Sequence, residues 1–420
     1  MKKFILQVLL VILSLFISHN SFSQIGWVLQ NSVTTNTLTG IYLINHTTGY
    51  VTGFNGTILK TTNFGNNWYS QNSGISSDLF STVFTDAQTG WCYGGISPDG
   101  YILKTTNGGQ NWIQNYHTTN LGSIFKGVFQ SGNTGYCGTL FGYILKSTNF
   151  GTNWNVVYSN TYGTGLYQCF FVDQNTGWFV GNNGLIVKTS NGGSNWNLQN
   201  ANTTNGLFGV YFISANTGIV VGINGTILKT TNGGQNWIAK SGITTLWLNC
   251  VHFINNNTGW IIGGNTSNTE TVILKTDNCG ENWTTQYSPT TTRLTYIHCN
   301  DAQNGIIVGL NGTLLKTTTG GSTFINNISN ENPTMFSLLQ NYPNPFNPST
   351  VIRYQIKNTG IVKISVLNML GKEIETLVNE KQLPGTYGVS WDGTDYPSGV
   401  YFYKISTGYY SETKKMILMK

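Results

Sequence analysis

The chain has 420 residues, of which only 9% are charged and 13% are aromatic, and its formal net charge is +6. Few charges combined with many aromatic residues exclude an intrinsically disordered chain, and Lys and Arg form no cluster of the kind that binds nucleic acid. The 51 glycines, with many Asn and Thr residues, predict a turn-rich, all-β protein with a neutral polar surface. Because the length exceeds that of one ordinary domain, we expect a large domain followed by a small one.

The first 23 residues have the pattern of a secretory signal peptide. Lys2 and Lys3 precede an apolar run over residues 4–17, and Ser21 and Ser23 supply small residues before a cleavage site at Gln24. The apolar run is too short to span a membrane stably. We therefore expect an exported protein whose mature chain begins at Gln24.

A segment of the form ILKTTNxGxNW recurs along the chain. Its copies end at tryptophans about 41 to 46 residues apart, and a degenerate seventh copy ends at Phe324. The six tryptophans are Trp68, Trp112, Trp154, Trp196, Trp237 and Trp283. Each repeat reads as an aromatic strand, a Thr-Gly turn, a short strand, an Asn-Gly turn, the ILKT strand and a strand that begins at the tryptophan. Four antiparallel strands per repeat predict a seven-bladed β-propeller over residues 24–325.

The two ends of the predicted propeller are complementary. Residues 27–32 are similar to the fourth strand of the first repeat, although they precede it, whereas the seventh repeat has a weak fourth strand at Phe324 and Ile325. We therefore predict that the N-terminal strand completes the last blade and closes the ring.

The turn after each ILKT strand resembles the Asp-box of sialidases and related propellers. The first copy contains Thr61, Asn63, Gly65 and Trp68 at the spacing of that motif. These turns are expected on the face opposite the usual binding loops, so we interpret them as structural hairpins. The wider repeat, over residues 40–324, resembles the family of photosystem II assembly and stability factors, which implies a seven-bladed propeller. That family's thylakoid partner is not carried over, because nothing in the sequence indicates photosynthesis.

The residue types needed for sialidase chemistry are missing. A sialidase needs three arginines to bind a carboxylate, and the chain has only Arg293 and Arg353. Asp78, Asp99 and Glu270 lie on loops of the expected binding face and could supply the two carboxylates of another glycosidase. We expect a protein that binds without catalysis, and the alternative is an extracellular hydrolase, glycosidase-like but not a sialidase.

Three sets of residues share a register and are read as structural. One lysine per ILKT strand is expected to pack its stem along the strand and to direct its ammonium group to water or a turn carbonyl. The lysines are Lys60, Lys104, Lys146, Lys188, Lys229, Lys275 and Lys316. His252 and His298 occupy a position that is large in every blade, so we expect neither a metal nor a cofactor. The six cysteines are expected to be buried free thiols, with Cys250 and Cys299 the pair best placed for a bridge.

The expected binding face carries the loops from the fourth strand to the next blade and from the second strand to the third. Loops on a rigid scaffold are common sites of recognition. The candidate ligand-binding residues are Tyr116, His117, Tyr162, Trp247, Asp99, Glu270 and Arg293. Aromatic residues among Asn and Thr suit either a glycan or a protein ligand, bound by a monomer.

The composition changes after residue 325. We expect a linker over residues 326–337 and a small immunoglobulin-like β-sandwich over residues 338–420. The YPNPFNP opening, the LGK turn, the SGVYFY strand and the basic end resemble the type A sorting domain of the type IX (Por) secretion system, with FlgD-like character. The residues that carry this resemblance are Pro343, Asn344, Pro345, Phe346, Gly371, Gly399, Tyr401, Lys414 and Lys415.

The resemblance to the sorting domain implies a destination. It implies passage through the outer membrane by the type IX secretion machinery, removal of the module, and release or attachment to surface lipopolysaccharide. The alternative is an ordinary sandwich that spaces the propeller from a partner.

Overall fold

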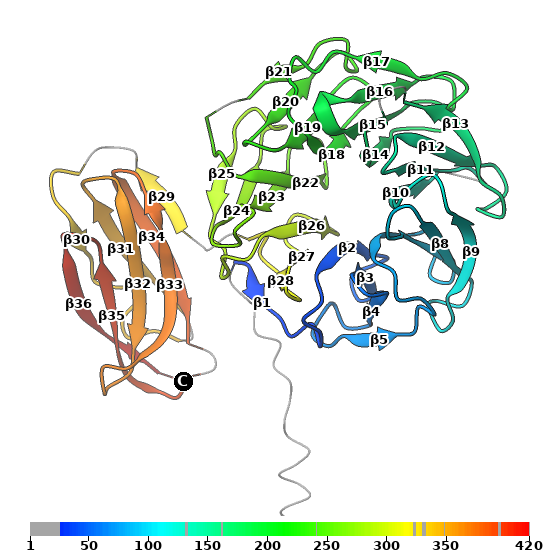
Figure 1. Ribbon diagram of the computed structural model, residues 1–420. Helices are drawn as coiled ribbons and strands as arrows, with labels where there is room; N and C mark the ends of the chain where they lie inside the picture. The colour runs from blue at the N-terminus through cyan, green and yellow to red at the C-terminus, as the bar shows by residue number, and fades with distance from the viewer. Residues whose placement is uncertain are drawn as a thin grey trace, which may run out of the picture.

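The computed structural model describes residues 26–130, 133–160, 163–240, 242–321, 325–329, 333–347, 349–393 and 396–419. The predicted signal peptide and Tyr162 lie outside these residues. Within them the strands form nine four-stranded sheets, and the one helical element is the short 3-10 turn η1 (Asn182–Gly184). Seven sheets surround a central axis as the blades of a propeller, and the C-terminal strands form a separate sandwich (Figure 1). None of the helical structure described is long and apolar enough to cross a membrane.

The first three blades follow the repeats in chain order, from the innermost to the outermost strand. Blade 1 contains β2 (Leu38–Leu43), β3 (Gly49–Gly53), β4 (Thr57–Thr61) and β5 (Tyr69–Gln71). Blade 2 contains β6 (Leu79–Phe84), β7 (Gly90–Gly94), β8 (Gly100–Thr105) and β9 (Ile113–Thr118). Blade 3 contains β10 (Ile124–Phe129), β11 (Gly135–Thr139), β12 (Tyr143–Ser147) and β13 (Asn155–Ser159).

The remaining blades repeat this order. Blade 4 contains β14 (Leu166–Phe171), β15 (Gly177–Gly181), β16 (Ile186–Thr189) and β17 (Asn197–Gln199). Blade 5 contains β18 (Leu207–Phe212), β19 (Gly218–Gly222), β20 (Ile227–Thr230) and β21 (Ile238–Ala239). Blade 6 contains β22 (Trp247–Phe253), β23 (Gly259–Gly264), β24 (Thr271–Thr276) and β25 (Thr284–Gln286). Blade 7 contains β26 (Leu294–Cys299), β27 (Gly305–Gly309), β28 (Leu314–Thr317) and, from the N-terminus, β1 (Val28–Leu29).

The N-terminal strand closes the ring, as predicted. Val28 pairs with Lys316 and Leu29 pairs with Leu315, so β1 is the outermost strand of blade 7. Trp27, which precedes β1, is 2% exposed and donates a hydrogen bond from Nε1 to Gln286 Oε1 of blade 6 at 2.9 Å. The segment over residues 27–29 therefore joins the last two blades.

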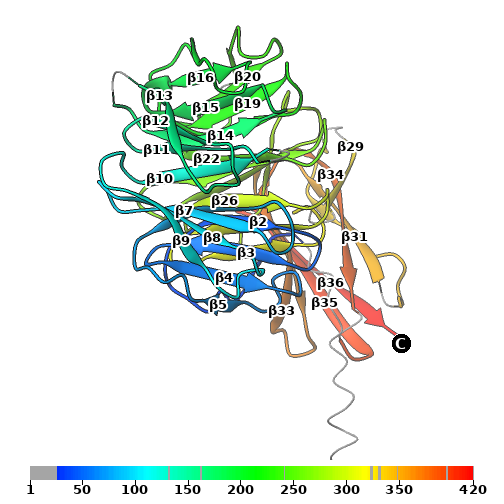
Figure 2. The same ribbon diagram turned by 90° about the vertical axis from the view of Figure 1, so that its right-hand side faces the viewer.

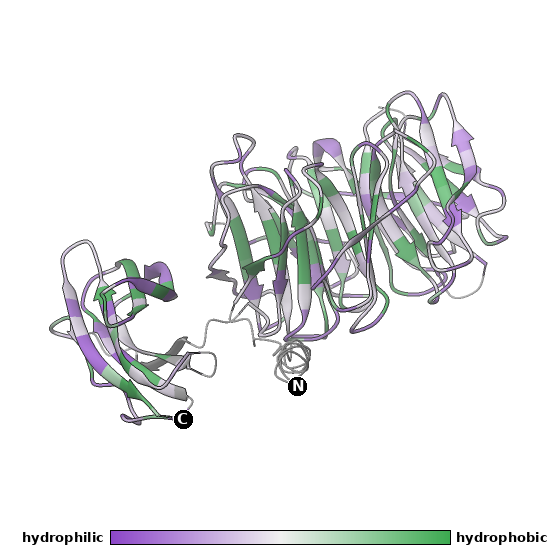
Figure 3. Cartoon of the chain, turned by 90° about the horizontal axis from the view of Figure 1, so that it is seen from below, coloured by the Kyte–Doolittle hydropathy of each residue, from purple (hydrophilic) through white to green (hydrophobic). Residues whose placement is uncertain are grey.

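The blades are apolar on both faces because each sheet packs between two others. The second strand of every blade is buried along its whole length, as in β3 and β15. Hydrophobic residues accordingly concentrate in the strands and hydrophilic ones in the connections (Figure 3). Figure 2 shows the stacked blades of this disc from the side.

The turns between the third and fourth strands have one repeated geometry. In blade 1, Gly65 N donates to Thr61 Oγ1 at 2.9 Å and Asn67 N donates to Asn63 Oδ1 at 2.9 Å. These bonds replace the backbone partners that the turn lacks, and they place Trp68, 3% exposed, against the blade. The residues of this motif therefore fix a hairpin.

The repeated lysines join neighbouring blades. Lys60 of blade 1 donates from Nζ to the carbonyl oxygen of Gly108 in the turn of blade 2 at 2.7 Å. Lys104, Lys146, Lys188 and Lys229 reach the corresponding turn carbonyls of the next blades. Lys316 instead reaches Asn66 Oδ1 at 2.6 Å, across the closure between blades 7 and 1. The prediction that these ammonium groups bind turn carbonyls is confirmed for five blades.

All six cysteines are free thiols, and five of them are buried. Cys250 and Cys299 pack in the same apolar cluster but form no bridge.

The C-terminal module is a two-sheet sandwich. One sheet has the order β29 (Ile325–Ser329), β34 (Gly385–Asp392), β31 (Ser349–Ile356), β30 (Ser337–Leu338). The other has the order β33 (Glu373–Gln382), β32 (Gly360–Leu367), β35 (Gly399–Ser406), β36 (Ser411–Leu418). Residues 326–337, expected as a linker, therefore contribute β29 and β30, because strand β34 offers an edge with which residues 325–329 pair.

The YPNPFNP segment attaches to the last strand of the chain. Phe346 is 2% exposed and forms a bridge with Leu418, while Asn344 Oδ1 accepts a hydrogen bond from Ile417 N at 2.9 Å. The Pro343 carbonyl accepts bonds from Asn341 and Thr350. The segment thus fixes the position of β36.

The other residues that carried the sorting-domain resemblance serve the same sheet. Gly371 takes a φ of 75° in the turn between β32 and β33, and Gly399 begins β35. Tyr401 is buried and donates to the Pro397 carbonyl, and Lys414 pairs with Glu412 at 3.2 Å.

Candidate functional site

Each of the seven inner strands contains a β-bulge near its start. In β2, Leu38 pairs with Gly53 and Gly40 pairs with Thr52, so Thr39 has no partner on β3. The equivalent extra residues are Thr39, Phe80, Phe125, Tyr167, Phe208, Asn249 and Thr295. A bulge residue leaves the ladder and turns its side chain away from the sheet. All seven line one cavity of about 360 Å³ at the mouth of the central channel.

Five aromatic side chains form a continuous arc around this mouth. Phe80 contacts Phe125 with ring centroids 4.9 Å apart, and Phe125 contacts Tyr167 at 4.9 Å. Tyr167 contacts Phe208 at 5.3 Å, and Phe208 contacts Trp247 at 5.8 Å. Each ring comes from a different blade, so the arc spans blades 2 to 6. We call Phe80, Phe125, Tyr167, Phe208 and Trp247 the aromatic arc.

The bulge residues on the other side of the mouth are polar. Asn249 Nδ2 donates to the Leu294 carbonyl at 2.6 Å, and Thr295 Oγ1 donates to the Leu38 carbonyl at 2.6 Å. Thr39 donates in the same way to the carbonyl of the next blade. These side chains use their hydrogen bonds to hold adjacent inner strands together.

Arg293 and Trp247 occupy equivalent positions in blades 7 and 6. Each comes one residue before a buried leucine, Leu294 or Leu248, that has the same place in its blade. The guanidinium carbon of Arg293 lies 5.4 Å from the Trp247 ring centroid, within the range of a cation–π contact. Burial lowers the pKa of Arg293, yet a guanidinium remains protonated at every physiological pH. The end of the aromatic arc thus carries a permanent positive charge.

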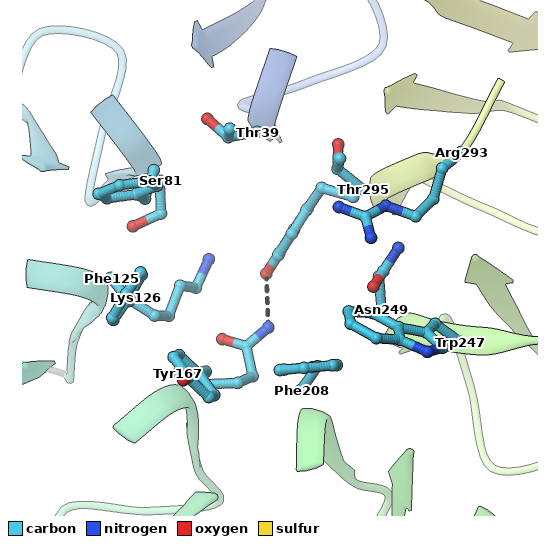
Figure 4. A pocket seen from close by; sticks show the side chains of 13 residues that line it. Thr39, Ser81, Phe125, Lys126, Tyr167, Phe208, Trp247, Asn249, Arg293 and Thr295 are labelled. Carbon is cyan, nitrogen blue, oxygen red and sulfur yellow. Dashed lines mark hydrogen bonds between the residues drawn. The ribbon is translucent and has the colours of Figure 1, made fainter. Parts of the chain in front are cut away.

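A second layer lies deeper in the channel. Lys126 Nζ lies 4.6 Å from the centroid of the Tyr296 ring, and Gln168 Nε2 donates to the Tyr296 hydroxyl at 3.2 Å (Figure 4). These three residues come from blades 3, 4 and 7, so Tyr296 crosses the axis. Burial is the largest single influence and acts to lower the pKa of Lys126, but interactions with Tyr296, Cys169 and Cys250 together raise it. Lys126 is therefore an ammonium ion inside the channel.

A third layer fills the channel towards the opposite face. The rings of His252 and His298 lie 4.9 Å apart, and His298 stacks on Tyr42 at 5.2 Å. His298 Nδ1 accepts a hydrogen bond from Leu43 N at 2.9 Å. Burial lowers the pKa of His252 to about 4 and that of His298 well below its usual value, so both imidazoles are neutral. Among the described residues, no group of three or more potential metal ligands occurs.

Comparison with protein families accounts for most of the chain. The model for the photosynthesis system II assembly factor YCF48 matches residues 19–166 and 194–287, more than half of the sequence. The chain belongs to the YCF48 family. The model for the secretion system C-terminal sorting domain matches residues 340–419. Both resemblances seen in the sequence are confirmed, and the sorting domain places this YCF48-family protein outside the cell or on its surface, exported by the type IX machinery.

Solved structures agree with this assignment. The structure described as YCF48 bound to D1 peptide has a TM-score of 0.59 and 21% identity, over 70% of this chain and 97% of that chain. YCF48 from Cyanidioschyzon merolae gives 0.58 and 18%, over 70% and 98%. The GH74 xyloglucanase from Xanthomonas campestris gives 0.56 and 9%, over 78% and 59%. At these identities the structures show a shared propeller fold. No curated protein matches the chain.

The structure brings two of the predicted ligand-binding residues of this YCF48-family propeller together and places four others elsewhere. Trp247 and Arg293 line the cavity. Asp99 Oδ1 lies 3.3 Å from His117 Nε2, and His117 stacks on Tyr101 at 4.6 Å, away from the cavity at the outer strand β9. Tyr116 is half-buried in the apolar cluster between blades 2 and 3.

Glu270 also lies outside the cavity. Its backbone N–H donates to Asn265 Oδ1 at 3.2 Å, and its carbonyl accepts from Asn265 N, within the loop between β23 and β24. Tyr162 is not among the described residues.

Sequence reasoning missed Lys126 and all seven bulge residues as site residues. A signal was nevertheless present. In every repeat a Leu or Ile begins the inner strand and is constant, whereas the next residue varies from Thr to Phe, Tyr or Asn. Variation beside a constant core position indicates a side chain that leaves the core.

Proposed function

We propose that this exported propeller is a binding protein without catalytic activity, whose ligand is a segment of another extracellular protein that enters the mouth of the central channel. The observation that carries the proposal is the aromatic arc, combined with Lys126 and Arg293, around a single cavity. Aromatic residues and arginine dominate the energetics of protein recognition sites. The arc therefore offers an apolar surface next to two positive charges.

The cavity is a poor site for glycoside hydrolysis. A glycosidase needs two carboxyl groups beside the scissile bond. The residues that line the cavity, all of them described, include neither Asp nor Glu. Asp99 and Glu270 lie outside it, and Asp78 Oδ1 accepts a hydrogen bond from Asn55 N at 3.0 Å. The GH74 resemblance concerns the fold, so it gives the hydrolase alternative no support from the site.

The shape of the cavity favours a protruding group over a long sugar chain. Seven inner strands surround the mouth, so a ligand enters end-on along the axis instead of crossing an open cleft. A side chain or a chain end meets this requirement. The structure described as YCF48 bound to D1 peptide, from the same family, adds support for a peptide ligand.

The test is a parallel screen of the full mature chain against a peptide library, a glycan array and a panel of glycosidase substrates. We expect peptide binding without substrate turnover. Phe208→Ala, at the centre of the arc, should weaken binding about 10- to 30-fold, because buried aromatic anchors contribute about 2 kcal/mol. Ile238→Ala is the matched control, since Ile238 is 62% exposed on the outer strand of the same blade.

Two outcomes would contradict the proposal. One is glycan cleavage, which would establish a hydrolase. The other is equal peptide binding by the Phe208→Ala variant and the wild type, which would place the site elsewhere.

A further inference from the structure

We propose that the group admitted to the channel is a carboxylate of the peptide ligand and that Lys126 binds it. This inference rests on the proposed binding function at the same mouth and specifies the chemistry that the mouth selects. The C-terminal carboxylate and the side chain of Asp or Glu share this chemistry, and the experiment below distinguishes them.

Lys126 differs from the repeated lysines of the propeller. Lys60 and its equivalents in most of the other blades donate to a turn of the neighbouring blade, so their charges have fixed partners. In the described part of the chain, no carboxylate lies within ion-pair distance of Lys126, whose neighbours are the ring and hydroxyl of Tyr296. Lys126 is half-buried, and a cation partly withdrawn from water without a counter-ion is costly. An anionic ligand would remove that cost.

Two further donors face the same cavity without a partner. Ser81 is 2% exposed, and among the described residues its Oγ has no hydrogen-bond partner. Arg293 Nε is likewise buried and unpaired within the described chain. Figure 4 shows Lys126 and Arg293 directed towards the centre of the cavity from opposite sides, with Ser81 at its margin. Unpaired donors beside a cavity can bind an acceptor group of a ligand.

The neighbouring groups favour a carboxylate over a phosphate. The cavity offers two cations, Lys126 and Arg293, and the Arg293 guanidinium also faces the Trp247 ring, so a singly charged carboxylate is served by Lys126 alone, whereas a phosphate monoester, with a charge of about −2 at pH 7, needs both. The aromatic arc lies above the layer of Lys126 and faces the part of the ligand that adjoins its charged group. A carboxylate attached to an apolar residue therefore fits both layers.

The chain end fits this description better than an internal acid does. All seven blades enclose the mouth. A C-terminal residue brings its carboxylate and its side chain into the mouth while only one segment of backbone passes through the opening. An internal Asp or Glu requires the backbone to enter and leave through the same opening. We therefore expect the C-terminal carboxylate to bind more strongly.

The experiment uses the full mature chain and a library of N-acetylated hexapeptides with aliphatic or aromatic residues at the last two positions. Each peptide is synthesised as the free acid and as the C-terminal amide, and a third arm carries an internal Asp or Asn with an amidated end. Loss of a charged hydrogen-bond partner costs about 1.5 to 3 kcal/mol. We therefore expect the free acids to bind about 10- to 100-fold more tightly than the amides.

The variants separate the charge from the fold. Lys126→Met should reduce the ratio of acid to amide affinity to about one, whereas Lys126→Arg should retain most of it. Phe208→Ala should weaken both forms equally and leave the ratio unchanged. If Lys126→Met fails to fold, Lys126→Gln replaces it; this variant should also bring the ratio to about one, and an unchanged ratio overturns the inference.

The outcomes for the two proposals are distinguishable. Peptides that bind equally as acids and amides overturn the carboxylate inference and leave the binding function intact. Stronger binding of the internal Asp peptides than of their Asn counterparts supports the inference, with the side chain as the source. Preference for phosphopeptides or for uronic acid glycans overturns it, and absence of peptide binding overturns both proposals.

Discussion

Trp27→Ala tests the closure of the ring by the N-terminal strand. Trp27 is 2% exposed, packs in the apolar cluster of blades 6 and 7, and donates a hydrogen bond to Gln286. Truncation of a buried tryptophan costs about 3 to 5 kcal/mol. At about 2.1 cal/mol/K of unfolding entropy per residue, a propeller of about 300 residues has about 0.6 kcal/mol/K, so a loss of about 4 kcal/mol lowers Tm by roughly 7 °C.

Differential scanning calorimetry of the mature chain measures this effect, and the transition of the C-terminal sandwich serves as an internal reference. Leu29→Ala is the matched control. Leu29 lies two residues further along and is 50% exposed, so its truncation should change the free energy of unfolding by no more than about 0.5 kcal/mol. If both variants lower the Tm of the propeller equally, the packing of Trp27 does not hold the ring closed and the reasoning fails.

Two further predictions concern single blades. Hydrogen bonds from Lys229 and Lys240 lower the pKa of Glu281 to about 2, below its ordinary value of 4.5, so the stabilisation is complete above about pH 4.5 and is lost as the pH falls towards 2. Glu281→Gln should therefore lower the free energy of unfolding, measured with urea at pH 7, by less than about 1 kcal/mol, because Glu281 is half exposed. At pH 3 the loss should be smaller still. An equal loss at pH 7 and pH 3 would contradict this prediction. Gly56→Ala should destabilise far more than Gly74→Ala. Both have positive φ, but a Cβ at Gly56 would lie 2.0 Å from the Ile75 carbonyl oxygen and one at Gly74 meets nothing within 4 Å; equal losses in Tm would refute the steric argument.

Features that recur in every blade could be predicted from the sequence. The lysine of the ILKT strand recurs in all seven blades, Trp68 has equivalents in five more, and the Asn55-Gly56 turn recurs in three more, so their spacing alone defined the blades. The closure of the ring was also predictable, because residues 27–32 are similar to a strand that the seventh repeat lacks. These inferences needed only contacts that are local or that repeat.

The cavity at the mouth of the channel was harder to predict, because it is lined by positions at which the blades carry different residues. Lys126 and Tyr296 meet across the axis, which follows only after seven blades have closed. The bulge residues interrupt the repeat pattern and therefore read as variable positions. Asp99 and His117 were chosen because their segments are irregular, yet Asp99 precedes the third strand β8 and His117 lies in the outer strand β9, so both are away from the cavity.

The start of the sandwich was obscured for a related reason. Residues 325–329 lose the composition of the repeats and read as a linker, but they pair with β34, whose edge is formed about 60 residues later. A local sequence pattern does not predict pairing with a strand that lies so far along the chain.

The bulges in the inner strands give the propeller an unusual freedom to change its specificity. Phe80, Phe125, Tyr167 and Phe208 pair with no residue of the second strand, so the sheet does not depend on which side chain occupies these positions. Their side chains converge on one opening. A lineage that exchanges residues at these four positions can acquire a new target while it keeps the same scaffold and the same route of export, and a library randomised there would be a direct source of engineered receptors.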